Sequence, residues 1–138
     1  MSTKMFFSKY EVQVYTILRI VAGFLLLWHG SQKLFGFPPE GQAIPSFIKF
    51  IAGPIEFFGG LLVMIGLWTH WTAFICSGQM AFAYWMAHGT HSVLPIQNGG
   101  ELAIIYCFLF LYISAMGSGE FSIDNLIGGK SKNNIQDK

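Results

Sequence analysis

The sequence predicts an all-α integral membrane protein, a four-helix bundle with both termini on the cytoplasmic side. Of its 138 residues, 53% are hydrophobic, 17% aromatic and only 11% charged, whereas an ordinary soluble domain has about 25% charged residues. The mean hydropathy is +0.50. Four apolar segments of roughly the length of a membrane-spanning helix fill most of the chain. We expect one domain over residues 1–128 and a polar tail over residues 129–138.

The net charge bears on the kind of partner, and the cysteine positions bear on the role of the thiols. The formal net charge is +1, which gives no electrostatic case for a nucleic-acid partner. The lipid bilayer is the expected environment. The two cysteines, Cys76 and Cys107, lie inside apolar segments and form no Cys-x-x-Cys motif, so we expect buried structural thiols.

The first apolar segment extends from Val12 to Phe35. Arg19 interrupts it early, and the segment ends in a polar stretch that contains His29 and Lys33 and has no small-residue cleavage pattern. We therefore expect a retained transmembrane helix and not a removed signal peptide. The glycines and prolines of residues 36–46 cannot continue a helix and predict a long connection.

The second segment, Phe47 to Trp68, contains one acidic residue, Glu56. Gly53 and Gly60 fall on the same helical face as Glu56, at spacings of three and four residues. This pattern predicts a close approach of another helix near the carboxylate. A close helix crossing is compatible with both a structural and a functional Glu56.

The last two segments follow a short turn predicted at residues 69–70. The third runs over residues 71–87 and the fourth over residues 101–116, with a polar connection over residues 88–100 between them. Glu101 opens the fourth segment, where an acidic side chain complements the positive end of the helix dipole. Both this capping role and a functional role remain open for Glu101.

The distribution of lysines predicts the orientation. Four spans place both termini and the 69–70 turn on one side, whereas the opposite side carries mainly Lys33 and Lys49. The positive-inside rule then places both termini in the cytoplasm. The lysines of that side are Lys4, Lys9, Lys130, Lys132 and Lys138.

Antiparallel helices with a rise of 1.5 Å per residue bring most of the intramembrane titratable groups to the outer half of the bundle. Only Arg19 falls in the cytoplasmic half. Ionisable side chains inside a membrane are costly unless paired, so such a group is a functional-site hypothesis by default. A purely structural ion network is the alternative. The groups predicted in the outer half are His29, Lys33, Glu56, His88 and Glu101.

This cluster fits a proton relay or the recognition of a small anion. Both uses suit a quinone head group, whose two carbonyls need a hydrogen-bond donor and a proton source. We expect His29 and Glu56 to be the catalytic, proton-handling pair. No nucleophile motif or metal-binding spacing accompanies them, so neither a metal nor a haem is expected. The residues expected to bind substrate are Arg19, Lys33, His88 and Glu101.

Several of these positions lie in motifs that resemble the DoxX family of small bacterial membrane proteins. The motifs are Leu18-Arg19-Ile20, Trp28-His29-Gly30, Lys33-Leu34-Phe35-Gly36, Glu56 with Gly59-Gly60, and Asn98-Gly99-Gly100-Glu101. The resemblance extends over residues 15–126. It implies a four-helix protein of the bacterial inner membrane, related to the membrane subunits of thiosulfate:quinone oxidoreductase. It also implies that the site includes His29, Lys33, Glu56 and Glu101.

Two functional hypotheses follow. The first is a quinone-linked redox subunit of sulfur or oxidative-stress metabolism, with a soluble redox partner or a second copy of the chain as candidate partners. The sequence has no reactive cysteine pair, which argues against a disulfide relay. The second is a non-enzymatic membrane scaffold or a carrier of a small solute, in which the cluster is structural.

Overall fold

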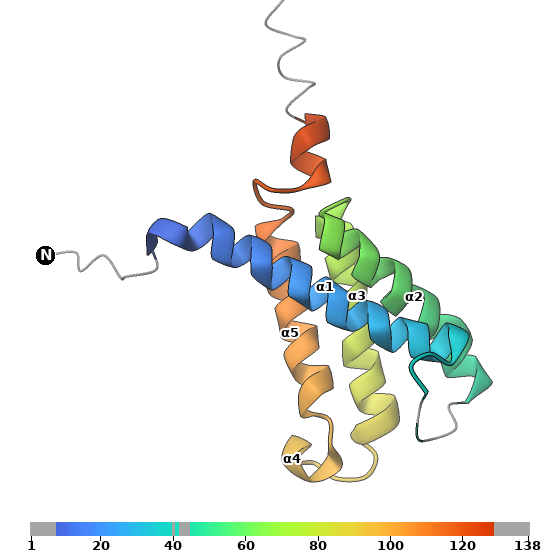
Figure 1. Ribbon diagram of the computed structural model, residues 1–138. Helices are drawn as coiled ribbons and strands as arrows, with labels where there is room; N and C mark the ends of the chain where they lie inside the picture. The colour runs from blue at the N-terminus through green and yellow to red at the C-terminus, as the bar shows by residue number, and fades with distance from the viewer. Residues whose placement is uncertain (1–7, 40, 42–44, 129–138) are drawn as a thin grey trace, which may run out of the picture.

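The structure is a computed structural model that describes residues 8–39, 41 and 45–128. Its described residues form helices joined by turns and contain no β-strand. Figure 1 shows the helices in chain order. They are η1 (Ser8–Tyr10), α1 (Glu11–Phe35), α2 (Ser46–Ile65), α3 (Thr69–Ala83), η2 (Tyr84–His88), α4 (Pro95–Asn98) and α5 (Glu101–Met116). Residues 123–128 are also helical.

The turn predicted at residues 69–70 was wrong, because α3 already begins at Thr69. Gly66 ends α2 in the left-handed conformation, at φ 73°, which costs glycine little. The backbone N–H groups of Trp68 and Thr69 donate to the Asp124 carboxylate at 2.8 and 3.1 Å. A distant residue therefore caps α3 and shifts the turn to residues 66–68.

The third and fourth predicted segments show two further differences. The π-helical η2 continues α3 to His88, one residue beyond the predicted end at residue 87. The polar connection contains the short helix α4, which the sequence analysis missed. The predicted bounds of α5, 101–116, are confirmed. The predicted tail, 129–138, lies outside the described residues.

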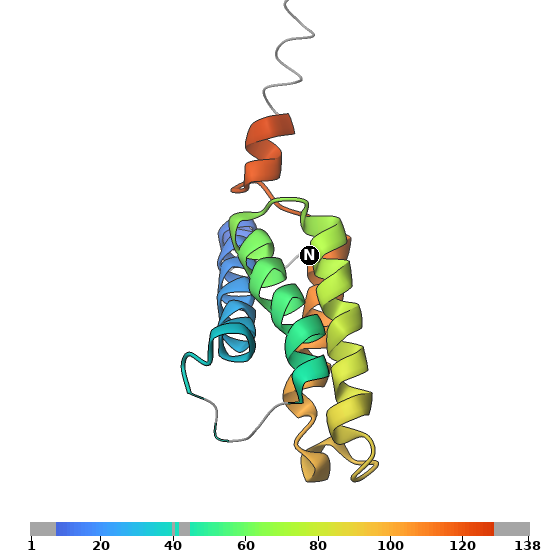
Figure 2. The same cartoon turned by 90° about the vertical axis from the view of Figure 1, so that its right-hand side faces the viewer.

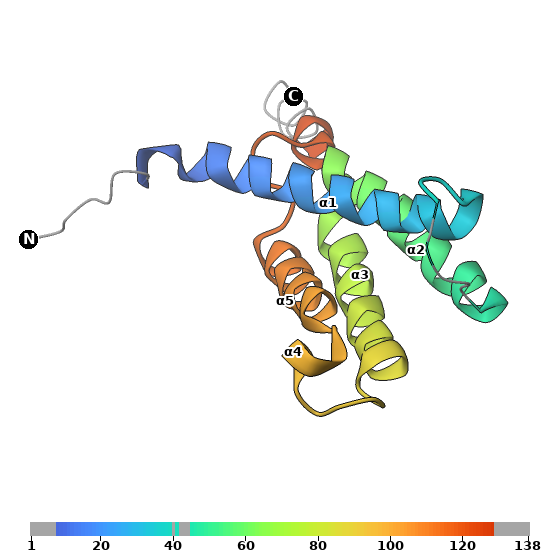
Figure 3. The same cartoon turned by 60° about the horizontal axis from the view of Figure 1, so that its bottom comes forward.

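The main helices pack as α1 on α2 and α3 on α5, with α2 and α3 joined by the short turn. Figures 1 and 3 show α1 lying obliquely across α3 and α5. The backbones of α1 and α2 approach each other closely at Gly23 and Gly60. A Cβ atom on Gly60 would lie 2.6 Å from both the Gly23 carbonyl oxygen and the Leu27 nitrogen. The predicted close crossing on the face of Glu56 is therefore confirmed.

The outer surface of the fold is rich in large apolar side chains. Phe50, Trp71 and Phe108 are each more than 60% exposed, which in water would leave an extended apolar surface uncovered. Two helical stretches, Ser8–Phe35 and Ser46–Ile65, are long and apolar enough to cross a membrane. The apolar helix α5 is shorter. The buried core comprises Tyr15, Ala22, Leu26, Val63, Ala73, Cys76, Met80, Tyr106, Phe110 and Ile113.

Candidate functional site

An ion pair between the half-buried Lys33 and the buried Glu56 joins the end of α1 to α2. The Lys33 ammonium lies 2.6 Å from Oε2 of Glu56, and Nε2 of Gln79 donates to Oε1 of the same carboxylate at 3.0 Å. Glu56 is only 2% exposed. Each carboxylate oxygen thus has a donor, one of them charged, as a buried carboxylate requires.

Local helix geometry brings Lys33 to Glu56. Lys33 occupies the last turn of α1, and Gly53 precedes Glu56 by one turn on the facing side of α2. A Cβ atom on Gly53 would lie 3.3 Å from the Cβ of Lys33 and 3.1 Å from the Leu34 side chain. The missing side chain at Gly53 leaves space for the aliphatic part of Lys33 to lie along α2. The ammonium can then reach the carboxylate one turn farther on.

The ion pair forms part of the wall of two cavities. We call the cavity of about 400 Å³ between α2 and the α3–η2 helix the lateral cavity. We call the cavity of about 270 Å³ between α1, α3 and α5 the central cavity. Lys33, Glu56, Ala83 and His88 line both. The pair can therefore contact both cavities.

The two histidines of the cluster differ in how they are held. Nδ1 of His88 lies 2.9 Å from the Asn98 carbonyl oxygen. A carbonyl only accepts, so Nδ1 carries a proton, and Nε2 is a proton acceptor when the ring is neutral. His29 lines the central cavity, and its ring stands edge-on to Tyr106 with centroids 6.0 Å apart. Either imidazole could exchange a proton with the central cavity.

The Arg19 side chain extends from α1 to the C-terminal end of α2 and lines neither cavity. Its guanidinium donates to the carbonyl oxygens of Val63 and Met64 at 2.6 and 2.9 Å, and to that of Phe121 at 2.6 Å. The side chain is 1% exposed. Two of these carbonyls, those of Val63 and Met64, lie in the last turn of α2, where carbonyls lack partners farther along the helix. The carbonyl of Val63 also accepts from the N–H of Gly66 at 3.2 Å. The structure therefore does not bring Arg19 to the ion pair.

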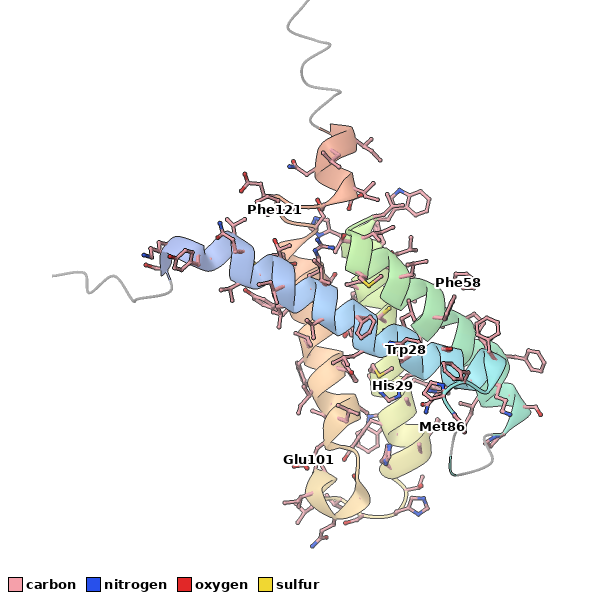
Figure 4. The ribbon with its side chains drawn as sticks, viewed as in Figure 1. Trp28, His29, Phe58, Met86, Glu101 and Phe121 are labelled. Carbon is pink, nitrogen blue, oxygen red and sulfur yellow. The ribbon has the colours of Figure 1, made fainter. Side chains whose placement is uncertain are left out.

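Glu101 also stands apart from the ion pair. Its side chain is exposed at the first position of α5, and it lines neither cavity. Figure 4 shows it beside α4 and away from His29. Of the six predicted site residues, four meet around the two cavities: His29, Lys33, Glu56 and His88.

Sequence reasoning did not assign Gln79 to the site. Its amide holds Glu56, and its own Oε1 is buried without a hydrogen-bond partner in the described part of the chain. Gln79 is the only strongly polar residue within its predicted helix, a signal that could have identified it. Asn98 was missed as well, because its contact with His88 depends on the path of the 88–100 connection.

The donors of the site suit an oxygen-bearing organic ligand better than a metal ion. In the described part of the chain, no group of three or more His, Cys, Asp or Glu side chains could hold a metal. The Lys33 ammonium has three N–H groups, of which one serves Glu56. A ligand carbonyl in the lateral cavity could accept from another.

The apolar helices and the buried polar site define an all-helical membrane protein. The sequence model of the DoxX family matches residues 14–89, a stretch that includes Lys33, Glu56, Gln79 and His88. The chain belongs to the DoxX family. No solved structure matches it.

Three relatives are similar to the chain over most of its length. An uncharacterized protein of Haemophilus influenzae is 38% identical, over 86% of this chain and 93% of the relative. The inner membrane protein YqjF of Escherichia coli is 29% identical, over 83% and 92%. The putative oxidoreductase CatD of Bacillus subtilis is 24% identical, over 86% and 91%.

Proposed function

We propose that this DoxX protein is a quinone-linked redox subunit in which the buried pair of Lys33 and Glu56 handles protons. The observation that carries the proposal is the position of this pair in the shared wall of two cavities. Buried ionisable pairs beside cavities are typical of proton-handling sites in membranes. The name of the relative CatD, a putative oxidoreductase, agrees with this class.

Each residue has a defined role in the proposal. A bound quinone accepts two electrons, supplied by a reduced sulfur donor, and two protons. Lys33 hydrogen-bonds a ring oxygen and donates a proton to it, while Glu56 holds the ammonium in place and Gln79 holds Glu56. His29 and His88 exchange protons with the central cavity. Arg19 stabilises the fold at the C-terminal end of α2.

The proposal includes four crossings of the bacterial inner membrane, with both termini in the cytoplasm. The relative YqjF is named an inner membrane protein. The 15 residues of α3 and the five of η2 form one continuous stretch, which at 1.5 Å per residue reaches about 30 Å. That length matches the hydrocarbon core of a bilayer.

The test is quinone reduction by the full chain in lipid nanodiscs, with thiosulfate, sulfite or sulfide as the donor. Glu56→Gln should lower turnover at least tenfold with the fold retained, because an amide keeps hydrogen-bonding capacity but does not hold the ammonium by charge. Glu120→Gln, the same change at an exposed position, is the matched control and should leave turnover unchanged. Wild-type protein that neither binds nor reduces quinone would contradict the proposal.

A structural role for the cluster is the second candidate, favoured by the fact that both oxygens of Glu56 already have donors. In this case the protein is a membrane scaffold or a carrier for a small solute. Glu56→Gln would then lower the thermal unfolding temperature, with no redox activity to lose. Measuring stability and turnover on the same sample separates the two candidates.

A further inference from the structure

The two cavities on either side of the ion pair differ in what surrounds them. The mouth of the lateral cavity is bordered by Phe47, Ile51, Phe82 and Met86, and each of these side chains is more than 40% exposed. Exposed apolar side chains on a membrane protein face lipid. A ligand that reaches this cavity therefore arrives from the bilayer and must itself be lipid-soluble.

The central cavity has a more polar lining, in which Leu102 is the one large apolar side chain more than 40% exposed. His29 and Tyr106 face it together with the shared Lys33, Glu56 and His88. A buried water needs two to four polar partners and a share of about 30 Å³, so a cavity of about 270 Å³ can hold several. Gly99 of the polar 88–100 connection also lines it, which places the cavity next to the polar end of the fold.

We propose that the pair of Lys33 and Glu56 separates two entrances: the lateral cavity receives the ring of a lipid-soluble quinone, and the central cavity holds the water that supplies its protons. The inference rests on the proposed function and assigns each substrate to one cavity. Reduction to the quinol consumes two electrons from the sulfur donor and two protons. Lys33 gives one proton to the ring oxygen that it contacts, and Nε2 of His88 gives the second proton to the other ring oxygen. Both side chains line the two cavities, and each regains its proton from water in the central cavity.

The geometry of the site supports the passage of protons from the central cavity to the lateral cavity through the pair of Lys33 and Glu56. Lys33 and Glu56 line both cavities, so the ammonium can contact a ring oxygen on one side and water on the other. His88, also shared, has its Nδ1 proton engaged by the Asn98 carbonyl, which leaves Nε2 to accept and release a proton. Gln79 lines only the lateral cavity, where it steadies Glu56 from the ligand side.

Two alanines allow matched tests. Ala87 lines only the lateral cavity and Ala103 only the central cavity, and neither is fully buried. Ala87→Trp should therefore obstruct the lateral cavity, and Ala103→Trp the central one. Thermal unfolding verifies that each variant folds, and the smaller Ala87→Leu and Ala103→Leu replace a variant that does not.

The probe is a photoreactive azido-quinone with a ten-carbon tail, added to the full chain in lipid nanodiscs, with labelled peptides mapped by mass spectrometry. Labelling should fall within residues 45–56 and 79–88. It should drop at least tenfold in Ala87→Trp and stay within twofold in Ala103→Trp. Turnover should drop at least tenfold in both variants, since one loses the ring and the other the proton supply.

The outcomes distinguish this inference from the proposed function. Labelling that is lost in Ala103→Trp but kept in Ala87→Trp would overturn the inference, as would quinone reduction without saturable labelling of the lateral cavity. Quinone reduction would in either case preserve the proposed function. Saturable labelling of the lateral cavity without any reduction would overturn the proposed function and the proton supply, and would leave only the lipid-side binding site.

Discussion

Two parts of α2 meet charged side chains of α1 in different ways. At the middle of α2, the Lys33 ammonium meets the Glu56 carboxylate, and both side chains line two cavities. At the C-terminal end of α2, the Arg19 guanidinium donates to two of its three backbone carbonyl partners and lines neither cavity. We call the first the Lys33–Glu56 end, because Lys33 lies in the last turn of α1, and the second the Arg19 end.

The comparison shows that an intramembrane charge alone does not mark a site. Arg19 is even more buried than Glu56, at 1% against 2% exposed, but its partners are backbone carbonyls, two of them in the last turn of α2, where helices leave carbonyls without partners. Titratable partners and an adjoining cavity distinguish the Lys33–Glu56 end. Stability should therefore depend most on the Arg19 end, and binding and turnover on the Lys33–Glu56 end.

The largest expected effect on stability is that of Arg19→Leu. The variant leaves the carbonyls of Val63, Met64 and Phe121 without their charged donor, and hydrogen bonds to charged groups contribute about 1.5–3 kcal/mol each. We expect a loss of about 4 kcal/mol or more in the free energy of unfolding, measured by denaturant titration in mixed micelles. Arg19→Lys is the matched control and should recover only part, because one ammonium cannot reproduce the planar guanidinium fork. A stable Arg19→Leu protein that has lost quinone binding would reverse the comparison.

An intermediate effect is expected for the Lys33–Glu56 end. Glu56→Leu leaves the Lys33 ammonium and the Gln79 amide without their acceptor, and breaking a buried pair costs about 3–5 kcal/mol. Lys33 is 16% exposed along its side chain, so we expect a cost near the lower limit. The double variant Lys33→Met with Glu56→Leu should be destabilised by less than the sum of the single variants, with a coupling of about 1–3 kcal/mol. Additive effects in the same titration would show that the two side chains do not interact.

The smallest effect on stability is expected for Asp124, whose carboxylate caps the start of α3 next to the Arg19 end. Asp124→Asn keeps one acceptor for the N–H groups of Trp68 and Thr69 but loses the second oxygen and the negative charge. Helix caps and dipole interactions each contribute about 1 kcal/mol. We expect a stability loss of about 1 kcal/mol and faster amide hydrogen exchange in the first turn of α3. Asp124→Ala should lose more, and equal exchange in all three proteins would exclude a capping role.

Much of the helical framework could be predicted from the sequence. The helix over residues 101–116 has the predicted bounds, because Gly100 and Gly117 delimit an apolar run. The Gly53, Glu56 and Gly60 spacing correctly predicted a close crossing. The predicted start of α3 was wrong because the residue that caps this helix, Asp124, is more than 50 residues away in the chain. Local pattern carries no information on such a contact.

The site was predicted less completely than the helices. The sequence by itself determined that polar side chains would be buried between apolar helices. Each apolar segment contains few charged residues, and a charged side chain in a membrane-spanning helix turns toward the neighbouring helices to find a partner. Only the tertiary structure decided their partners: Lys33 and Gln79 hold Glu56, Arg19 binds backbone carbonyls, and Glu101 is exposed. The physical reason is that depth follows from helical rise, whereas contact depends on how helices rotate and cross. Glycine contacts between α1 and α2 set that crossing, and with it the pair that lies between the two cavities.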